Sequence, residues 1–172
     1  MNLKKQITLL ERLTGKRVAL KEADIEAPPH DLYGASYFSL TNLEQLKRLP
    51  IFDTWRGMEI KQEDSETYFI LNNEIVVVCG IDDQSKPPTM GGIEVNKKYR
   101  QKGFGLSVYE YYINKYNGIL SDLTISPDAL ALWKSLARKY KVEVVDYYDH
   151  NKKISSNIDD VSKDAYVLCA HK

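Results

Sequence analysis

The residues best suited to chemistry lie between Ile93 and Gly105, where the sequence reads IEVNKKYRQKGFG. An apolar, strand-like segment ends at Val95, a basic turn follows, and two glycines separated by one residue open an amphipathic helical pattern. Such a turn presents bare backbone N–H groups at the positive end of a helix dipole, where phosphate groups bind. The sequence therefore predicts a phosphate-bearing ligand here, and we call residues 100–106 the glycine turn.

Two familiar phosphate motifs do not match the spacing of the glycine turn. A P-loop ends in Gly-Lys-Ser/Thr, and the residues after Gly105 do not follow that order. The dinucleotide fingerprint needs a third glycine where Val108 stands, and it usually lies near the start of a βαβ unit. The turn therefore requires a different interpretation.

The pattern Arg100-x-x-Gly103-x-Gly105 resembles the acyl-CoA pyrophosphate turn of the GCN5-related N-acetyltransferase (GNAT) family, which reads Arg/Gln-x-x-Gly-x-Gly/Ala. The passage from Val95 to Arg100 is similar to that family's strand-to-turn passage, although Lys97 stands where proline is often found. This match covers the residues that would hold the cofactor.

A second segment, Ser126-x-x-Ala129-x-x-x-Trp133, matches the spacing of another GNAT segment, usually Asn-x-x-Ala-x-x-x-Tyr. The form with tryptophan at the last position also looks like phage-encoded members of the family. Ser126 is followed by Pro127 and an acid, which is typical of a helix start, so the serine also has a capping role.

The resemblance implies a fold of the α/β (α+β) class, with a mixed, mostly antiparallel central sheet of about six to seven strands flanked by helices. It implies one domain over residues 1–172 that moves an acetyl group directly from acetyl-CoA, or another acyl-CoA, to an amine of a small molecule or protein. The alternative is a GNAT-fold binding or virion-associated protein with weak or no catalysis. Homodimerisation stays open.

The resemblance also implies how the cofactor is held. Backbone amides from Gln101 to Leu106 bind the pyrophosphate, and Val95 pairs with the pantetheine arm and polarises the thioester carbonyl. Lys97, Lys98 and Lys102 either contact phosphates or form a solvated basic turn. The implied cofactor contacts are Ile93, Val95, Arg100, Gln101, Lys102, Gly103, Phe104, Gly105, Leu106, Ser126 and Trp133.

Acyl transfer needs a base for the amine and an acid for the departing thiolate. Family members commonly supply the acid from a tyrosine at the position of Trp133, whose indole has no usable proton, so Trp133 is either a core residue or a wall of the acyl slot. Tyr140 is the candidate substitute acid, and Tyr109 and Tyr112 are alternatives, although packing explains the spacing of all three better. Glu94, the carboxylate nearest the turn, is the candidate base.

Composition limits the other functions. The 172 residues include 24 basic and 24 acidic side chains, so no global field recruits nucleic acid or a membrane. No apolar run approaches the roughly 20 residues of a membrane span, and the first residues do not form a signal peptide. A nucleic-acid binder using residues 97–102 remains a rival, with a steep salt dependence as its signature.

Cys79 and Cys169 lie in apolar, strand-like runs, which predicts buried free thiols and a reducing cytoplasm, with a disulfide between them as the less favoured alternative. His30, His150 and His171 lack ligand spacing with acids or cysteines, so we expect no metal site.

Periodicity predicts the elements that position these residues. Helices are expected at 3–13, before Pro50, at 104–116 and from 127 onward, and a polar loop at 149–163. Strands are expected at 16–22, 58–62, 66–71, 74–81, 89–95, 119–123, 142–148 and 165–169.

Overall fold

The computed structural model describes residues 43–162 and 166–172, all within the second of two units into which the chain divides, Tyr37–Lys172. The elements predicted at 3–13 and 16–22 and the helix cap predicted at Thr41 lie outside the described residues. The expectation of one domain over residues 1–172 stays a prediction.

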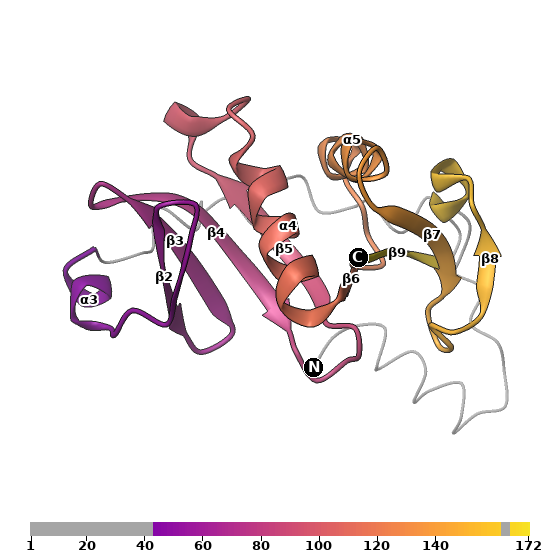
Figure 1. Ribbon diagram of the computed structural model, residues 1–172, viewed down its shortest axis with the longest axis horizontal. Coiled ribbons are helices and arrows are strands. Elements are labelled where there is room, and N and C mark those ends of the chain that lie inside the picture. Colours follow the sequence, from indigo (N-terminus) through magenta and orange to yellow (C-terminus); the bar gives the residue numbers. More distant parts are fainter. Residues whose placement is uncertain (1–42, 163–165) are drawn as a thin grey trace, which may run out of the picture. The chain divides into compact units, whose positions relative to one another are not determined.

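The described chain is built on a mixed nine-stranded sheet of order β1-β2-β3-β4-β5-β6-β9-β7-β8, shown in Figure 1. Every neighbouring pair is antiparallel except β5 and β6. In chain order the elements are α3 (Leu43–Arg48), β1 (Asp53–Trp55), β2 (Met58–Glu63), β3 (Glu66–Leu71), β4 (Glu74–Asp82), β5 (Thr89–Val95), η3 (Lys97–Tyr99), α4 (Phe104–Tyr116), β6 (Gly118–Leu120), α5 (Pro127–Leu136), β7 (Lys141–Asp146), β8 (Lys153–Ser155), η4 (Ile158–Ser162) and β9 (Tyr166–His171).

The predicted mixed, mostly antiparallel sheet with flanking helices is confirmed. The predicted number of strands, about six to seven, is wrong, because the sheet has nine. The missed strands, β1 and β8, are three-residue edge strands, too short to carry a period-two pattern. Strand β8 and the turn η4 occupy the segment predicted to be a polar loop. Strand β6 is shorter than predicted and ends at Leu120.

Local chemistry explains why the long elements begin and end where predicted. Asn72 and Asn73 form the two-residue turn between β3 and β4 with φ of 52° and 61°, the left-handed geometry that hairpin turns favour and asparagine tolerates. The Ser126 side chain accepts a hydrogen bond from the Ala129 N–H at 3.2 Å, which caps α5, and Pro127 occupies its first position.

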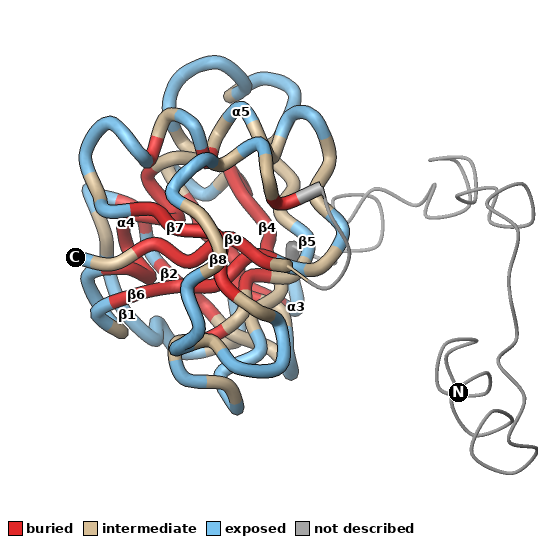
Figure 2. Tube along the Cα trace, turned by 90° about the vertical axis from the view of Figure 1, so that its right-hand side faces the viewer, coloured by how far each residue is buried: buried red, intermediate tan, exposed pale blue. Residues whose placement is uncertain are grey.

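The sheet separates two layers of buried side chains, and the central strands are buried throughout their middles (Figure 2). Helices α4 and α5 pack on one face, where Phe69, Tyr112 and Trp133 belong to the main core cluster. Leu46 of α3 packs with Tyr68 on the opposite face. No helix in the described part of the chain is long and apolar enough to cross a membrane.

Both cysteines are buried free thiols, as the sequence predicts. Burial raises the pKa of the Cys79 thiol and of the Cys169 thiol to about 12 in each case. A folded-state pKa above the unfolded value stabilises the fold at low pH, so this contribution is full below about pH 9 and is lost as pH rises toward 12.

We expect neither thiol to react quickly with a chromogenic disulfide reagent in the folded protein at about pH 8, because the reactive thiolate is absent and the sulfurs are covered. Both should react at once after unfolding in guanidinium. Stopped-flow absorbance checks this, and a fast phase of one thiol in the folded protein would contradict the burial.

Candidate active site

Strand β5 leaves the sheet on one side, and this opens an edge beside the glycine turn. Its parallel pairing with β6 is limited to Thr89 opposite Leu120, at the start of β5. On the other side β5 stays paired with β4 as far as Val95. The two neighbours of β5 therefore diverge along its length, and among residues 43–162 and 166–172 the end of the strand is paired on the β4 side only.

Register shows which backbone groups face this open edge. The Asn96 N–H donates to the Val76 carbonyl of β4 at 2.9 Å. Because antiparallel strands alternate between hydrogen-bonded and non-hydrogen-bonded pairs, Glu94 also directs its backbone polar groups toward β4. Ile93 and Val95 direct theirs the other way, where β6 has diverged. An extended ligand can add to this edge in the manner of a strand.

Asn96 and Arg100 hold the chain as it leaves β5. The Asn96 side-chain oxygen accepts from the Lys98 N–H at 3.1 Å, while its amide nitrogen donates to the Ile75 carbonyl at 3.1 Å. The Arg100 Nε donates to the Val95 carbonyl at 3.0 Å. Arg100 therefore braces the strand end with one N–H and keeps its other guanidinium N–H groups on an exposed side chain. Nothing in the sequence marked Asn96 as part of the site.

The glycine turn opens α4 without a side-chain cap. Gly103 occupies the cap position with φ of +82°, a left-handed conformation that suits glycine. The first helical bond runs from the Ser107 N–H to the Gly103 carbonyl at 3.0 Å. The amides of residues 104–106 lie in the first turn, where a helix offers no acceptor of its own. These N–H groups and the helix dipole make an anion site.

Gly105 has a packing role. A Cβ at this position would lie 3.1 Å from Leu132 Cδ1 and 3.4 Å from Val95 Cγ2. The first turn of α4 therefore packs closely between the end of β5 and α5, and a side chain longer than a methyl group would force these elements apart. The structure thus brings the two segments singled out by the sequence together, with Leu132 next to Gly105.

The basic residues before the turn differ in their surroundings. Lys98 pairs with Glu74 at 2.7 Å, and Lys98 and Tyr99 hold the pKa of the Glu74 carboxyl below its usual range. Lys102 Nζ lies 5.6 Å from the centre of the Tyr99 ring. Lys97 is exposed. Lys97 and Lys102 thus remain candidates for phosphate contacts, whereas Lys98 is already ion-paired.

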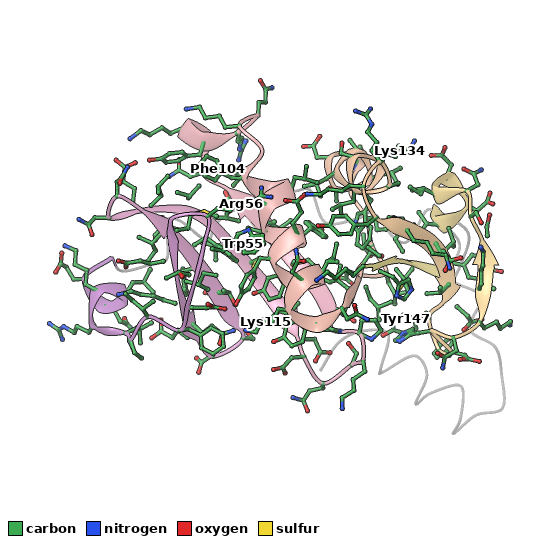
Figure 3. The ribbon with its side chains drawn as sticks, viewed as in Figure 1. Trp55, Arg56, Phe104, Lys115, Lys134 and Tyr147 are labelled. Atoms are coloured by element: carbon green, nitrogen blue, oxygen red, sulfur yellow. The ribbon has the colours of Figure 1, made fainter. Side chains whose placement is uncertain are left out.

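An open pocket of about 380 Å³ lies against the start of α4. Its walls come from Lys102 and Gly103 in the glycine turn, from Ser107 on α4, from Arg56 in the turn between β1 and β2, and from Lys139 just after α5. Figure 3 shows Arg56 and Phe104 on the same flank of α4, with Lys134 apart on α5. Sequence analysis missed Arg56 and Lys139 because no motif surrounds them.

Trp133 lies in the core with 1% of its surface exposed. Its ring meets the Tyr109 ring edge to face, with the ring centres 5.3 Å apart. Burial raises the pKa of the Tyr109 hydroxyl, and a hydrogen bond from Trp133 partly offsets that shift. Trp133 is therefore a core residue beneath the turn, and its predicted contact with a cofactor stays a prediction.

The two catalytic candidates occupy different faces and elements. Glu94 lies opposite Val78 in the sheet register, so its side chain is on the face of Tyr68 and not that of Val95. The Tyr140 ring packs against the main core cluster with the Lys139 ammonium 5.6 Å from its centre. Neither lines the pocket, so their roles stay predictions.

Metal chemistry has no visible basis in the described part of the chain. Across residues 43–162 and 166–172, no three histidine, cysteine, aspartate or glutamate side chains are grouped as metal ligands.

Comparison with known proteins gave matches to solved structures only. No family model matches the chain. No curated protein matches it either.

The solved structures that match include three acetyltransferases. A diaminobutyrate acetyltransferase from Paenibacillus lautus, solved with L-2,4-diaminobutyric acid and coenzyme A, is 13% identical over 63% of this chain and 70% of its own, with a TM-score of 0.41. The ribosomal-protein-S18-alanine N-acetyltransferase of Escherichia coli is 13% identical over 89% of each chain, with a TM-score of 0.36. A Bacillus subtilis acetyltransferase in complex with CoA is 12% identical over 76% of this chain and 91% of its own, with a TM-score of 0.39.

Proposed function

We propose that this protein binds acetyl-CoA, or another acyl-CoA, and transfers the acyl group to an amine of a small molecule or protein. One observation carries the proposal: the open edge of β5 at Ile93 and Val95 runs directly into a helix-opening glycine turn. A pantetheine arm has amide groups that pair with an extended strand, and a pyrophosphate suits the first-turn amides. Both parts of one ligand are thus served by one continuous segment.

When bound, acetyl-CoA supplies an activated thioester. Residues 101–106 would hold the pyrophosphate, and the Val95 N–H would donate to the thioester carbonyl as its carbon is attacked. Glu94 would take the proton of the attacking amine nitrogen, through water because its side chain lies on the other sheet face. As the carbon–sulfur bond breaks, Tyr140 would return a proton to the sulfur. The products would be an amide and a free thiol, and Glu94 and Tyr140 would regain their starting protonation states by proton exchange with solvent.

The proposal is tested first by calorimetry of the full chain with acetyl-CoA. We expect binding in the micromolar range, about −8 kcal/mol, as for a cofactor held by several charge-assisted hydrogen bonds. A folded sample that produces no heat at millimolar acetyl-CoA would refute it.

Glu94→Gln and Tyr140→Phe separate catalysis from binding. If these residues are the base and the acid, each variant should lower the rate of thiol release by about a hundredfold or more, while the affinity for acetyl-CoA changes little. Glu59→Gln, an exposed glutamate on β2, is the matched control. Wild-type turnover in both variants would remove the two assignments and leave cofactor binding untouched.

A second candidate is a binding protein that holds acyl-CoA without turnover. Its basis is that a buried Trp133 stands at the position where family members commonly have a tyrosine acid. Tight binding with no thiol release for any amine offered would support this candidate over the enzyme.

A further inference from the structure

A buried carboxylate flanked by two cations lies at the pocket beside the glycine turn. Glu110 of α4 has only 5% of its side chain exposed. Its Oε2 is 2.6 Å from Arg56 Nη2, and its Oε1 is 2.6 Å from Lys139 Nζ. Arg56 comes from the β1–β2 turn and Lys139 from the turn that follows α5, so Glu110 joins segments that are distant in sequence.

Both cations have N–H donors left over for a ligand on the solvent side. The Arg56 and Lys139 side chains remain 53% and 58% exposed although each is paired with Glu110. A guanidinium has five N–H donors and an ammonium has three, so one ion pair leaves most of them available. Lys102 adds a third cation to the same lining. Three positive charges against one carboxylate give the pocket wall a net charge of +2.

Arg56 is held in place by its neighbours. It occupies the first position of the two-residue turn that joins Trp55 to Met58, with φ of 51°. The Trp55 Nε1 donates to the Ser107 hydroxyl at 3.0 Å, which ties this turn to α4. The guanidinium carbon lies 5.3 Å from the centre of the Trp55 ring. The cation is therefore positioned before any ligand arrives, which lowers the entropy cost of binding.

We propose that this pocket holds a phosphate-monoester subsite, adjoining the pyrophosphate site at the first-turn amides, in which Arg56, Lys102 and Lys139 bind the phosphate. The ion pairs with Glu110 aim the first two cations at the pocket. A phosphate monoester carries about −1.5 to −2 charge near neutral pH, which matches the net charge of the wall. Arg56 also suits bidentate binding of two phosphate oxygens.

Two sources offer this chemical group. One is the ribose phosphate of coenzyme A, and in that case the inference rests on the proposed function. The other is a separate phosphorylated molecule, for which inorganic phosphate is the simplest probe. The subsite is the same in both cases, and the experiment distinguishes them.

The experiment measures binding of coenzyme A, dephospho-coenzyme A and inorganic phosphate to the full chain by calorimetry. The test variants are Arg56→Gln and Lys139→Gln. Lys134→Gln is the matched control, because Lys134 lies on α5 and pairs with Asp159 away from the pocket. Thermal melting of each variant ensures that only folded samples are compared.

If the cofactor supplies the phosphate, the wild type and Lys134→Gln should bind coenzyme A at least about tenfold more tightly than dephospho-coenzyme A, and both test variants should lose most of this preference. If the source is separate, the two nucleotides bind equally or not at all, and phosphate binds to the wild type but not to the test variants.

Two results would overturn the subsite. One is a wild type that shows no preference between the nucleotides and no phosphate binding. The other is a preference that survives in both test variants. Failure of the proposed function is a separate result: neither nucleotide binds, and phosphate binding to the wild type and the test variants then decides the subsite independently.

Discussion

Replacing Trp133 with alanine is expected to lower the free energy of unfolding by about 3–5 kcal/mol. Trp133 is 1% exposed and is among the largest fully buried side chains in the described chain. Truncation would leave a cavity under α4, remove the edge-to-face contact with Tyr109, and leave the buried Tyr109 hydroxyl without its hydrogen-bond donor. Urea unfolding followed by tyrosine and tryptophan fluorescence or circular dichroism measures this loss.

Trp133→Phe is the matched control, because it keeps an aromatic ring but removes the N–H donor. We expect it to cost less than alanine, on the order of 1–3 kcal/mol. A loss below about 1 kcal/mol for Trp133→Ala would show that the indole is not the packed core residue described above. Such a result would return Trp133 to the alternative of an acyl-slot wall.

Gly105→Leu should weaken acetyl-CoA binding by at least about a hundredfold, the equivalent of losing two hydrogen bonds to a charged group. The added side chain would meet Leu132 and Val95, whose nearest atoms lie 3.1 Å and 3.4 Å from the position of a Cβ. Since a fully packed site cannot take the extra atoms, the first turn of α4 must move away from β5, and its amides move with it. Overpacking also costs about 1–3 kcal/mol of stability.

Gly105→Ala tests whether the size of the added side chain causes the loss of binding. Its single methyl group meets the flexible end of the Leu132 side chain, which can shift by a few tenths of an ångström, so affinity should fall only a few-fold. Calorimetry with acetyl-CoA below the melting temperature of each variant measures the effect. If Gly105→Leu stays folded and binds like the wild type, the first-turn amides are not the pyrophosphate site.

The predicted strands β3 and β5 and helix α4 have the bounds found in the structure, and the reason is local. A β-branched or alternating run between turn residues favours a strand over other structures. Asn72-Asn73 and Gly103 can adopt the left-handed backbone that the adjoining turn needs. The short edge strands β1 and β8 carry no such pattern. Their pairing depends on the neighbouring strand, so only the assembled sheet defines them.

The residues of the site likewise fall into those that local sequence predicts and those that meet only through tertiary packing. Residues 93–106 were identified from the sequence because the strand, the turn and the helix start are consecutive and their chemistry depends on backbone conformation. Arg56, Glu110 and Lys139 come from three separate elements, and their contacts exist only once β1, α4 and α5 are packed. No spacing rule relates residues that meet through tertiary contacts.

The sequence by itself determined the glycine turn and the helix it opens, because short-range backbone preferences fix both. It also indicated the alternation that places Glu94 and Val95 on opposite faces. Only the tertiary structure decided that β6 diverges from β5, that Leu132 closes on Gly105, and that Trp133 is buried beneath the turn. Each of these depends on long-range packing, which a local pattern does not encode.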